Sequence, residues 1–196
     1  MKKTLFILTI VLVSGCNVLP SNKSEQIVKP DVIQTIKPPT PEKTYQSALE
    51  FYNKNYFIQA SQAFLKAAQQ NHAKSQFRLA RMYYDGKGVD NNYSAEAAKW
   101  YKKAAEQGHI EAQYFLGALY FVGSGGIAQS FSKARQWYYK AAKQGHIEAQ
   151  LSLGMMHYNG KGVKKDITET KKWLSLAAAQ GNEDADLMLQ KPELNQ

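Results

Sequence analysis

Three histidines recur at one position of a repeated segment, and histidine is a residue type that suggests a metal site. They are His72, His109 and His146, which follow one another at intervals of 37 residues. Equivalent positions in stacked helices lie about 8 to 10 Å apart, whereas zinc needs its ligands about 2 Å from one ion. We therefore expect no metal and no cofactor, and we interpret these histidines as polar residues at the turns between repeats.

Glycine-rich turns suggest phosphate binding, because Gly-Lys-Gly occurs at residues 86–88 and again at 160–162. The sequence predicts no strand before either turn, and neither turn continues into the Gly-Lys-Ser/Thr ending of a P-loop. The sequence also shows no nucleophile beside a base, no paired carboxylates at a shared site and no metal-ligand spacing. We therefore expect that this chain is not an enzyme.

Three tryptophans, Trp100, Trp137 and Trp173, are candidates for a stacking platform that binds a sugar or a single strand of nucleic acid. They keep strict phase with a stripe of alanines, which favours packing in the core of a helical array. We therefore leave the tryptophans out of the predicted site.

The single cysteine of the chain, Cys16, ends a segment that has the features of an export signal. Lys2 and Lys3 form a positive start, and residues 5–13 form an apolar run shorter than the roughly 20 residues of a membrane span. Val-Ser-Gly-Cys at residues 13–16 resembles the bacterial lipoprotein box, which implies cleavage before Cys16 and its acylation with fatty acids such as palmitate. We expect a lipoprotein signal peptide over residues 1–15; the alternative is an ordinary signal with a chance cysteine.

The chain is basic, with 25 Lys and Arg against 16 Asp and Glu and a formal net charge of +9. Removal of Lys2 and Lys3 with the signal lowers this charge by two. A basic cytosolic protein would suggest nucleic acid, but an exported one meets anionic lipid, polysaccharide and acidic proteins. We therefore expect a protein or peptide partner and a membrane contact through the N-terminal lipid, with no nucleic acid and no small-molecule substrate.

Residues 16–40 carry the lipidated cysteine and then a segment without a sustained apolar period. Prolines lie at Pro20, Pro30, Pro38 and Pro39. A proline-rich chain rises about 3.1 Å per residue, so this segment predicts a disordered tether that spans several tens of ångströms.

The rest of the chain is dominated by internal repetition. The tryptophans are spaced by 37 and 36 residues, and Gly108, Gly145 and Gly181 repeat both spacings. In the second unit, Ala112, Leu116 and Leu119 share one face of a predicted helix, which Gly123 ends. A second helix with Ala134, Trp137, Ala141 and Ala142 on its apolar stripe follows. In the third unit, Asp166 and Glu169 predict an N-cap and its capping-box partner.

These landmarks resemble the Sel-like repeat, a relative of the tetratricopeptide repeat, in three copies over residues 73–181. Residues 41–72 look like one tetratricopeptide helix pair, and residues 182–196 like a capping helix and tail. The resemblance implies an all-α solenoid of stacked helix-turn-helix repeats, in which the first helix of each pair lines the concave surface.

A candidate binding site follows from positions that vary between repeats while the framework stays constant. Leu79, Leu116 and Leu153 are equivalent and unchanged, whereas other positions on the same helices differ. By resemblance these variable positions line the concave groove, and the alternative is an unconstrained solvent face. The predicted partner-binding residues are Arg78, Arg81, Phe115, Ala118, Ser152 and Met155.

Together these features predict a non-catalytic interaction scaffold that a lipid anchors in the bacterial cell envelope. Asn17 replaces the aspartate that commonly retains lipoproteins in the inner membrane, so we expect the outer membrane and a periplasmic orientation. One alternative is a surface-exposed protein that interacts with a host. An envelope hydrolase is the other, and it would need an active site that the sequence does not show.

Overall fold

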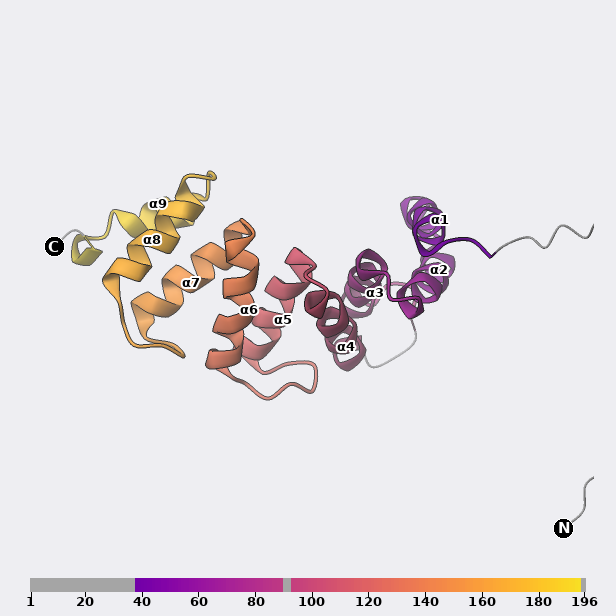
Figure 1. The fold of residues 1–196 in the computed structure, drawn as a ribbon, viewed down its shortest axis with the longest axis horizontal. Helices are drawn as coiled ribbons and strands as arrows, with labels where there is room; N and C mark the ends of the chain where they lie inside the picture. Colours follow the sequence, from indigo (N-terminus) through magenta and orange to yellow (C-terminus); the bar gives the residue numbers. More distant parts are fainter. Residues whose placement is uncertain (1–37, 90–92, 195–196) are drawn as a thin grey trace, which may run out of the picture. The chain divides into compact units, whose positions relative to one another are not determined.

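The computed structural model describes residues 38–89 and 93–194, so the predicted signal peptide, Cys16 and most of the predicted tether lie outside the described residues. All regular structure in the described ranges is helical (Figure 1). The helices are α1 (Pro41–Asn53), α2 (Phe57–Gln69), α3 (Ala73–Asp85), α4 (Tyr93–Glu106), α5 (Ile110–Val122), α6 (Phe131–Lys143), α7 (Ile147–Asn159), α8 (Ile167–Ala178), α9 (Glu183–Leu189) and the 3₁₀ turn η1 (Pro192–Leu194). None of these described helices is long and apolar enough to cross a membrane.

The helices pack in successive pairs. A repeat protein buries the apolar stripes of its helices by this kind of packing. Helix α1 packs on α2, α3 on α4, α5 on α6 and α7 on α8, and each second helix also contacts the first helix that follows it. Figure 1 shows this order from α1 to α9. The predicted all-α solenoid is therefore confirmed.

The second unit illustrates how small residues set the spacing of the helices. Ala112, Leu116 and Leu119 are buried as predicted. A Cβ atom at Gly117 would lie 2.7 Å from Cδ1 of Tyr138 on α6, so a larger residue there would require the Tyr138 ring to shift. Helix α5 ends at Gly123, whose φ of 78° is left-handed as the C-cap prediction requires.

The predicted apolar stripe of α6 is confirmed at Ala134, Ala141 and Ala142, which are buried. Trp137 is only partly buried and packs against the core, whereas the neighbouring Tyr138 is buried. The Tyr138 ring lies against Gly117 of α5. Lys140 Nζ lies 4.0 Å from the centroid of the partly buried Trp137 ring.

Two of the three repeated histidines, His109 and His146, cap the first helices at the turns between repeats, whereas His72 pairs with the side chains of Ser75 and Glu42. Nδ1 of His109 accepts from Ala112 N at 3.4 Å, and Nδ1 of His146 accepts from Ala149 N at 3.3 Å. Burial lowers the pKa of both imidazoles below the ordinary value, and nearby glutamates oppose this effect only in part. Among the described residues, no group of three or more metal-binding side chains comes together.

The predicted capping box of α8 is half formed. Asp166 Oδ1 accepts from Glu169 N at 2.9 Å, which is the predicted N-cap. The Glu169 carboxylate does not return to the Asp166 backbone, because it accepts from Lys172 and from Trp173 Nε1 instead. The Asp166 N–H donates to the carbonyl of His157, at 3.2 Å.

Glutamine side chains join each repeat to the next, a feature that the sequence analysis did not predict. Gln113 Nε2 donates to the Ala105 carbonyl at the end of α4, at 3.2 Å, and Gln113 Oε1 accepts from Gln144 Nε2 at 2.8 Å. The same two bonds recur around Gln76 and around Gln150. Buried amides that are satisfied in this way hold the repeats in one register.

Candidate protein-binding surface

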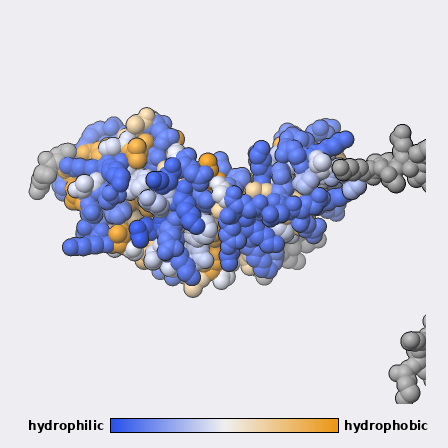
Figure 2. Space-filling model, in the orientation of Figure 1, coloured by the Kyte–Doolittle hydropathy of each residue, from blue (hydrophilic) through white to orange (hydrophobic). Residues whose placement is uncertain are grey.

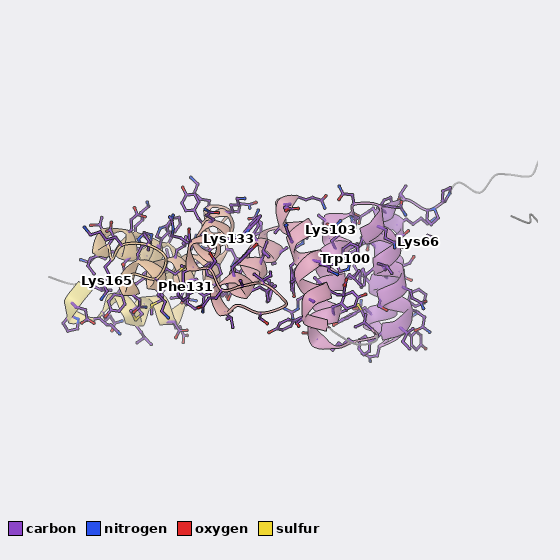
Figure 3. All side chains as sticks on the ribbon, turned by 90° about the horizontal axis from the view of Figure 1, so that it is seen from below. Lys66, Trp100, Lys103, Phe131, Lys133 and Lys165 are labelled. Carbon is purple, nitrogen blue, oxygen red and sulfur yellow. The ribbon has the colours of Figure 1, made fainter. Side chains whose placement is uncertain are left out.

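The first and second helices of the pairs carry opposite charge, so they present different surfaces to a partner. The five first helices, α1, α3, α5, α7 and α9, hold four Lys or Arg and eight Asp or Glu. The four second helices hold ten Lys or Arg and three Glu. Lys66, Lys103 and Lys133 of the second helices follow one another along the array in Figure 3.

Some lysines of the second helices also lie over aromatic rings of the same helices. Lys103 Nζ lies 4.4 Å from the centroid of the Trp100 ring, and Lys172 Nζ lies 5.3 Å from that of Trp173. Both tryptophans are otherwise buried. The rings therefore serve packing and cation–π contacts, and they do not form an open stacking platform.

The predicted residues of α3 and α5 are brought together by the structure. The Arg81 guanidinium lies 5.0 Å from the centroid of the Phe115 ring and pairs with Asp85 at 3.5 Å. Arg78 lies one turn earlier on α3 and is exposed. Asp85 therefore partly offsets the charge of Arg81, whereas Arg78 presents its charge to solvent.

Phe115 is a packing residue as well as a surface residue. Its ring stacks on Tyr101 of α4, with the centroids 5.3 Å apart and an interplanar angle of 13°, and it also contacts Phe77 and Tyr114. Burial raises the pKa of Tyr101 well above its ordinary value. Phe115 therefore packs within the fold with part of its ring and leaves the rest accessible, and its role in partner binding stays a prediction.

The remaining predicted residues lie around α5 and α7. Ala118 is partly buried against the core. The Ser152 hydroxyl donates to the Glu148 carbonyl at 2.7 Å. Ser152 and Met155 line a cavity of about 350 Å³, together with Phe121, Tyr138 and others. A cavity of this size is at the lower end of the range for ligand sites.

The predicted site includes only Ser152 and Met155 of the residues that line this cavity, and it lacks among others Phe121, Tyr138 and Lys161. The sequence does contain a signal for this cavity, because Tyr101 and Tyr138 are equivalent residues. The side chains at the positions that face these tyrosines change from large to small between the two repeats.

Other hollows lie elsewhere on the array. One of about 710 Å³ is lined by Tyr56, Ile58, Gly88 and Val89 among others. Grooves of about 380 and 360 Å³ lie beside Trp100 and Trp173, against the glutamines that join the repeats. None of these hollows contains a residue of the predicted site.

Hydrophobic residues are unevenly distributed over the surface. The face in Figure 2 is almost uniformly hydrophilic over α2 to α4 and shows hydrophobic patches over the half that holds α5 to α9. The cavity beside Ser152 belongs to that second half.

Solved structures with the same fold are available for comparison. The chain is similar to a protective antigen present in uropathogenic Escherichia coli strains, with 32% identity and a TM-score of 0.72, and to a Sel1 repeat protein from Oxalobacter formigenes, with 36% identity and a TM-score of 0.70. Each comparison covers 76% of this chain, but it covers only 32% of the first protein and 62% of the second. A comparison with curated proteins gave no match.

The sequence matches the Sel1 repeat family over residues 73–109, 110–146 and 147–182, which is more than half of the chain. These ranges agree with the three Sel-like copies predicted from the landmarks. Sel1 repeat proteins are in general protein-interaction scaffolds. The chain belongs to the Sel1 repeat family.

Proposed function

We propose that this protein is a non-catalytic scaffold of the bacterial cell envelope, which a lipid on Cys16 anchors and which binds a partner protein or peptide along the first helices α3, α5 and α7. The observation that carries this proposal is a constant framework beneath a variable surface. Arg81 and Phe115 form the surface between two repeats, whereas Ser152 and Met155 line a cavity at the next position.

The framework explains why this variation is informative. Leu79, Leu116 and Leu153 are all buried, and the glutamine bonds repeat between each pair of repeats. A stack held in this way tolerates changes on its outer positions, so each repeat can be fitted separately to a segment of a partner. A few well-placed residues then supply most of the binding free energy.

The anchor is supported by the N-terminal sequence alone, because Cys16 lies outside the described residues. Fatty acids on Cys16 would hold the protein at a membrane, and the outer membrane with a periplasmic orientation is the location we propose. Metabolic labelling with a fatty-acid probe tests the anchor: wild type should incorporate label and Cys16→Ser should not. Equal label on both proteins would contradict it.

The partner is tested by chemical crosslinking in intact cells followed by purification and mass spectrometry. The scaffold proposal expects one or a few envelope proteins that crosslink reproducibly to peptides from α3, α5 or α7. Crosslinks confined to the second helices would contradict the proposed surface.

A second candidate function is interaction with a host at the cell surface. The observation that favours it is the similarity to a protective antigen present in uropathogenic Escherichia coli strains. Protease treatment of intact cells separates the two locations: a periplasm-facing protein should be protected until the outer membrane is permeabilised, whereas a surface-exposed protein should be digested at once.

A further inference from the structure

The cavity beside Ser152 occupies a place that an aromatic side chain fills one repeat earlier. In the earlier repeat, Phe115 of α5 stacks on Tyr101 of α4, and the guanidinium of Arg81 of α3 lies 5.0 Å from the centroid of the same phenyl ring. The equivalent residues one repeat later are Ser152, Tyr138 and Ala118. Two large side chains are thus replaced by two small ones over an unchanged tyrosine.

At the Ser152 position a space remains that the described residues do not fill. The cavity of about 350 Å³ is lined by Phe121, Tyr138, Ser152, Met155 and Met156, with Lys161 also on its wall. One repeat further on, Leu174 takes the tyrosine position and Met188 takes the Ser152 position, and both pack in a buried cluster. The cavity therefore lies at the interface between the repeats of residues 110–146 and 147–182.

The wall combines aromatic and thioether groups with one cation. Phe121 and Tyr138 offer ring surfaces, and methionine sulfur makes favourable contacts with aromatic rings. Lys161 Nζ lies 5.2 Å from the Phe121 ring centroid and 5.6 Å from that of Phe131. These contacts hold the ammonium group beside the cavity, where it can pair with a carboxylate of an incoming ligand.

We propose that this cavity, the aromatic-anchor pocket, receives a phenylalanine- or tyrosine-sized side chain of a partner peptide, with an adjacent acidic residue that pairs with Lys161. The inference deepens the proposed function, since the peptide belongs to the partner that binds this surface. Phe115 shows which side chain fits over the equivalent tyrosine, and Lys161 supplies the complementary charge.

The methionines of the protein provide a direct readout. Met155 and Met156 line the pocket, whereas Met82 and Met188 lie elsewhere. The full-length chain, labelled with ¹³C at its methionine methyl groups, is titrated by NMR with a blocked peptide that contains Asp-Phe-Asp between glycine and serine residues. We expect ring-current shifts at Met155 and Met156 and none at Met82 and Met188.

Matched peptides test the chemistry of the ligand. Replacement of the phenylalanine by alanine should weaken binding at least about tenfold, because the burial of an aromatic side chain is lost. Replacement of the two aspartates by asparagine should weaken it by a few fold and should remove most of its dependence on salt. Equal binding of the phenylalanine and alanine peptides would overturn the proposal.

Variants of the protein test where the peptide binds. Ser152→Phe should fill the pocket as Phe115 fills its own site and should abolish the shifts; Ser152→Leu is the smaller substitute if the phenylalanine variant does not fold. Lys161→Gln should remove the preference for aspartate, whereas Lys164→Gln, at an exposed position in the same turn, should not. Unchanged binding by a folded Ser152 variant would place the ligand elsewhere.

Two outcomes would assign the pocket a different occupant and would overturn the proposal. Shifts of Met155 and Met156 that grow with protein concentration, without peptide, would identify a second copy of the chain. Equal shifts with a leucine peptide would identify a general apolar site. The crosslinking experiment in cells can fail while this titration succeeds, so the failure of the scaffold proposal is distinguishable from the failure of the pocket.

Discussion

The guanidinium of Arg81 lies 5.0 Å from the centre of the Phe115 ring, and the two residues come from different repeats. This contact joins the first helices α3 and α5 across their exposed sides. A cation on an aromatic face contributes about 0.5 to 1 kcal/mol at an exposed site. Neighbouring repeats are therefore coupled at the surface that we propose for partner binding, so a change in one repeat alters what the next one presents.

Charge reversal on α3 should weaken partner binding. The change Arg78→Glu with Arg81→Glu removes two cations from the proposed surface, and against an acidic partner we expect the affinity to fall at least tenfold. The wild-type affinity should also fall as salt rises. The measurement is titration calorimetry with the partner identified by crosslinking, at low and physiological salt.

The matched control for this pair is Lys102→Glu with Lys103→Glu on the second helix α4. Both lysines are exposed, but Lys103 lies over the Trp100 ring and Lys102 lies 3.9 Å from Glu106, so a thermal melt first checks that this variant folds. If the α4 pair weakens binding and the α3 pair does not, the partner binds the basic second helices and our surface assignment is wrong.

Phe115→Ala should destabilise the fold, contrary to what its variable position in the sequence suggests. The ring contacts Phe77, Tyr101 and Tyr114, and its removal leaves a cavity above Tyr101. Because the ring is only partly buried, we expect a loss of about 2 to 3 kcal/mol, less than the cost of a fully buried phenylalanine. Chemical denaturation measures this loss, and Phe51→Ala, at an exposed ring, is the control.

The tryptophans should differ in their contribution to stability. Trp173 is 4% exposed and its Nε1 donates to Glu169 at 3.0 Å, so Trp173→Ala should cost about 3 to 5 kcal/mol. Trp137→Ala should cost clearly less, because the ring is only partly buried beneath Lys140. Thermal melts compare the two variants, and an equal loss would show that Trp137 is packed more fully than the structure indicates.

The histidine caps should make stability depend on pH. Burial lowers the pKa of His109 and His146 in the folded protein, whereas in the unfolded chain they titrate near 6.5. The unfolded chain therefore binds protons first as the pH falls. Stability should be fully present above about pH 7 and should decrease as the pH falls through 6.5 toward the lower folded pKa. Denaturation at pH 7.5 and pH 5.5 measures this decrease.

Asparagine is the matched substitute for these histidines, because Asn182 caps α9 by accepting from Ala185 N at 2.8 Å. The double variant with His109→Asn and His146→Asn should keep both caps and reduce the loss of stability at pH 5.5. The buried His157, whose pKa burial also lowers, should leave a residual dependence. A dependence as steep as that of wild type would contradict the assignment to the caps.

Much of the fold follows from the sequence because its landmarks are periodic. The spacing of Gly108, Gly145 and Gly181 predicts the ends of the repeats, and Asp166 predicts the start of α8, where the structure has its N-cap. Such features depend on local backbone geometry, and the residue types that favour each geometry can be recognised in the sequence.

The parts that were not predicted depend on contacts between helices. How tightly Tyr138 is packed depends on what another helix places against its ring, here Gly117 of α5. The glutamine bonds need three chain segments in place at once. The cavity beside Ser152 exists because side chains fill this interface between repeats less completely than they fill the preceding one. The sequence of a single repeat does not reveal such a difference.

The most direct test of the scaffold proposal is site-specific photo-crosslinking in intact cells. A photoreactive phenylalanine analogue replaces Arg78 or the exposed Val122 on the first helices, or Lys102 or Lys143 on the second helices, and the crosslinked products are compared on a gel. We predict a discrete product with an envelope protein from Arg78 and Val122 and none from Lys102 and Lys143. A product from the second helices alone, or no product from the first helices, would contradict the claim that this surface binds the partner.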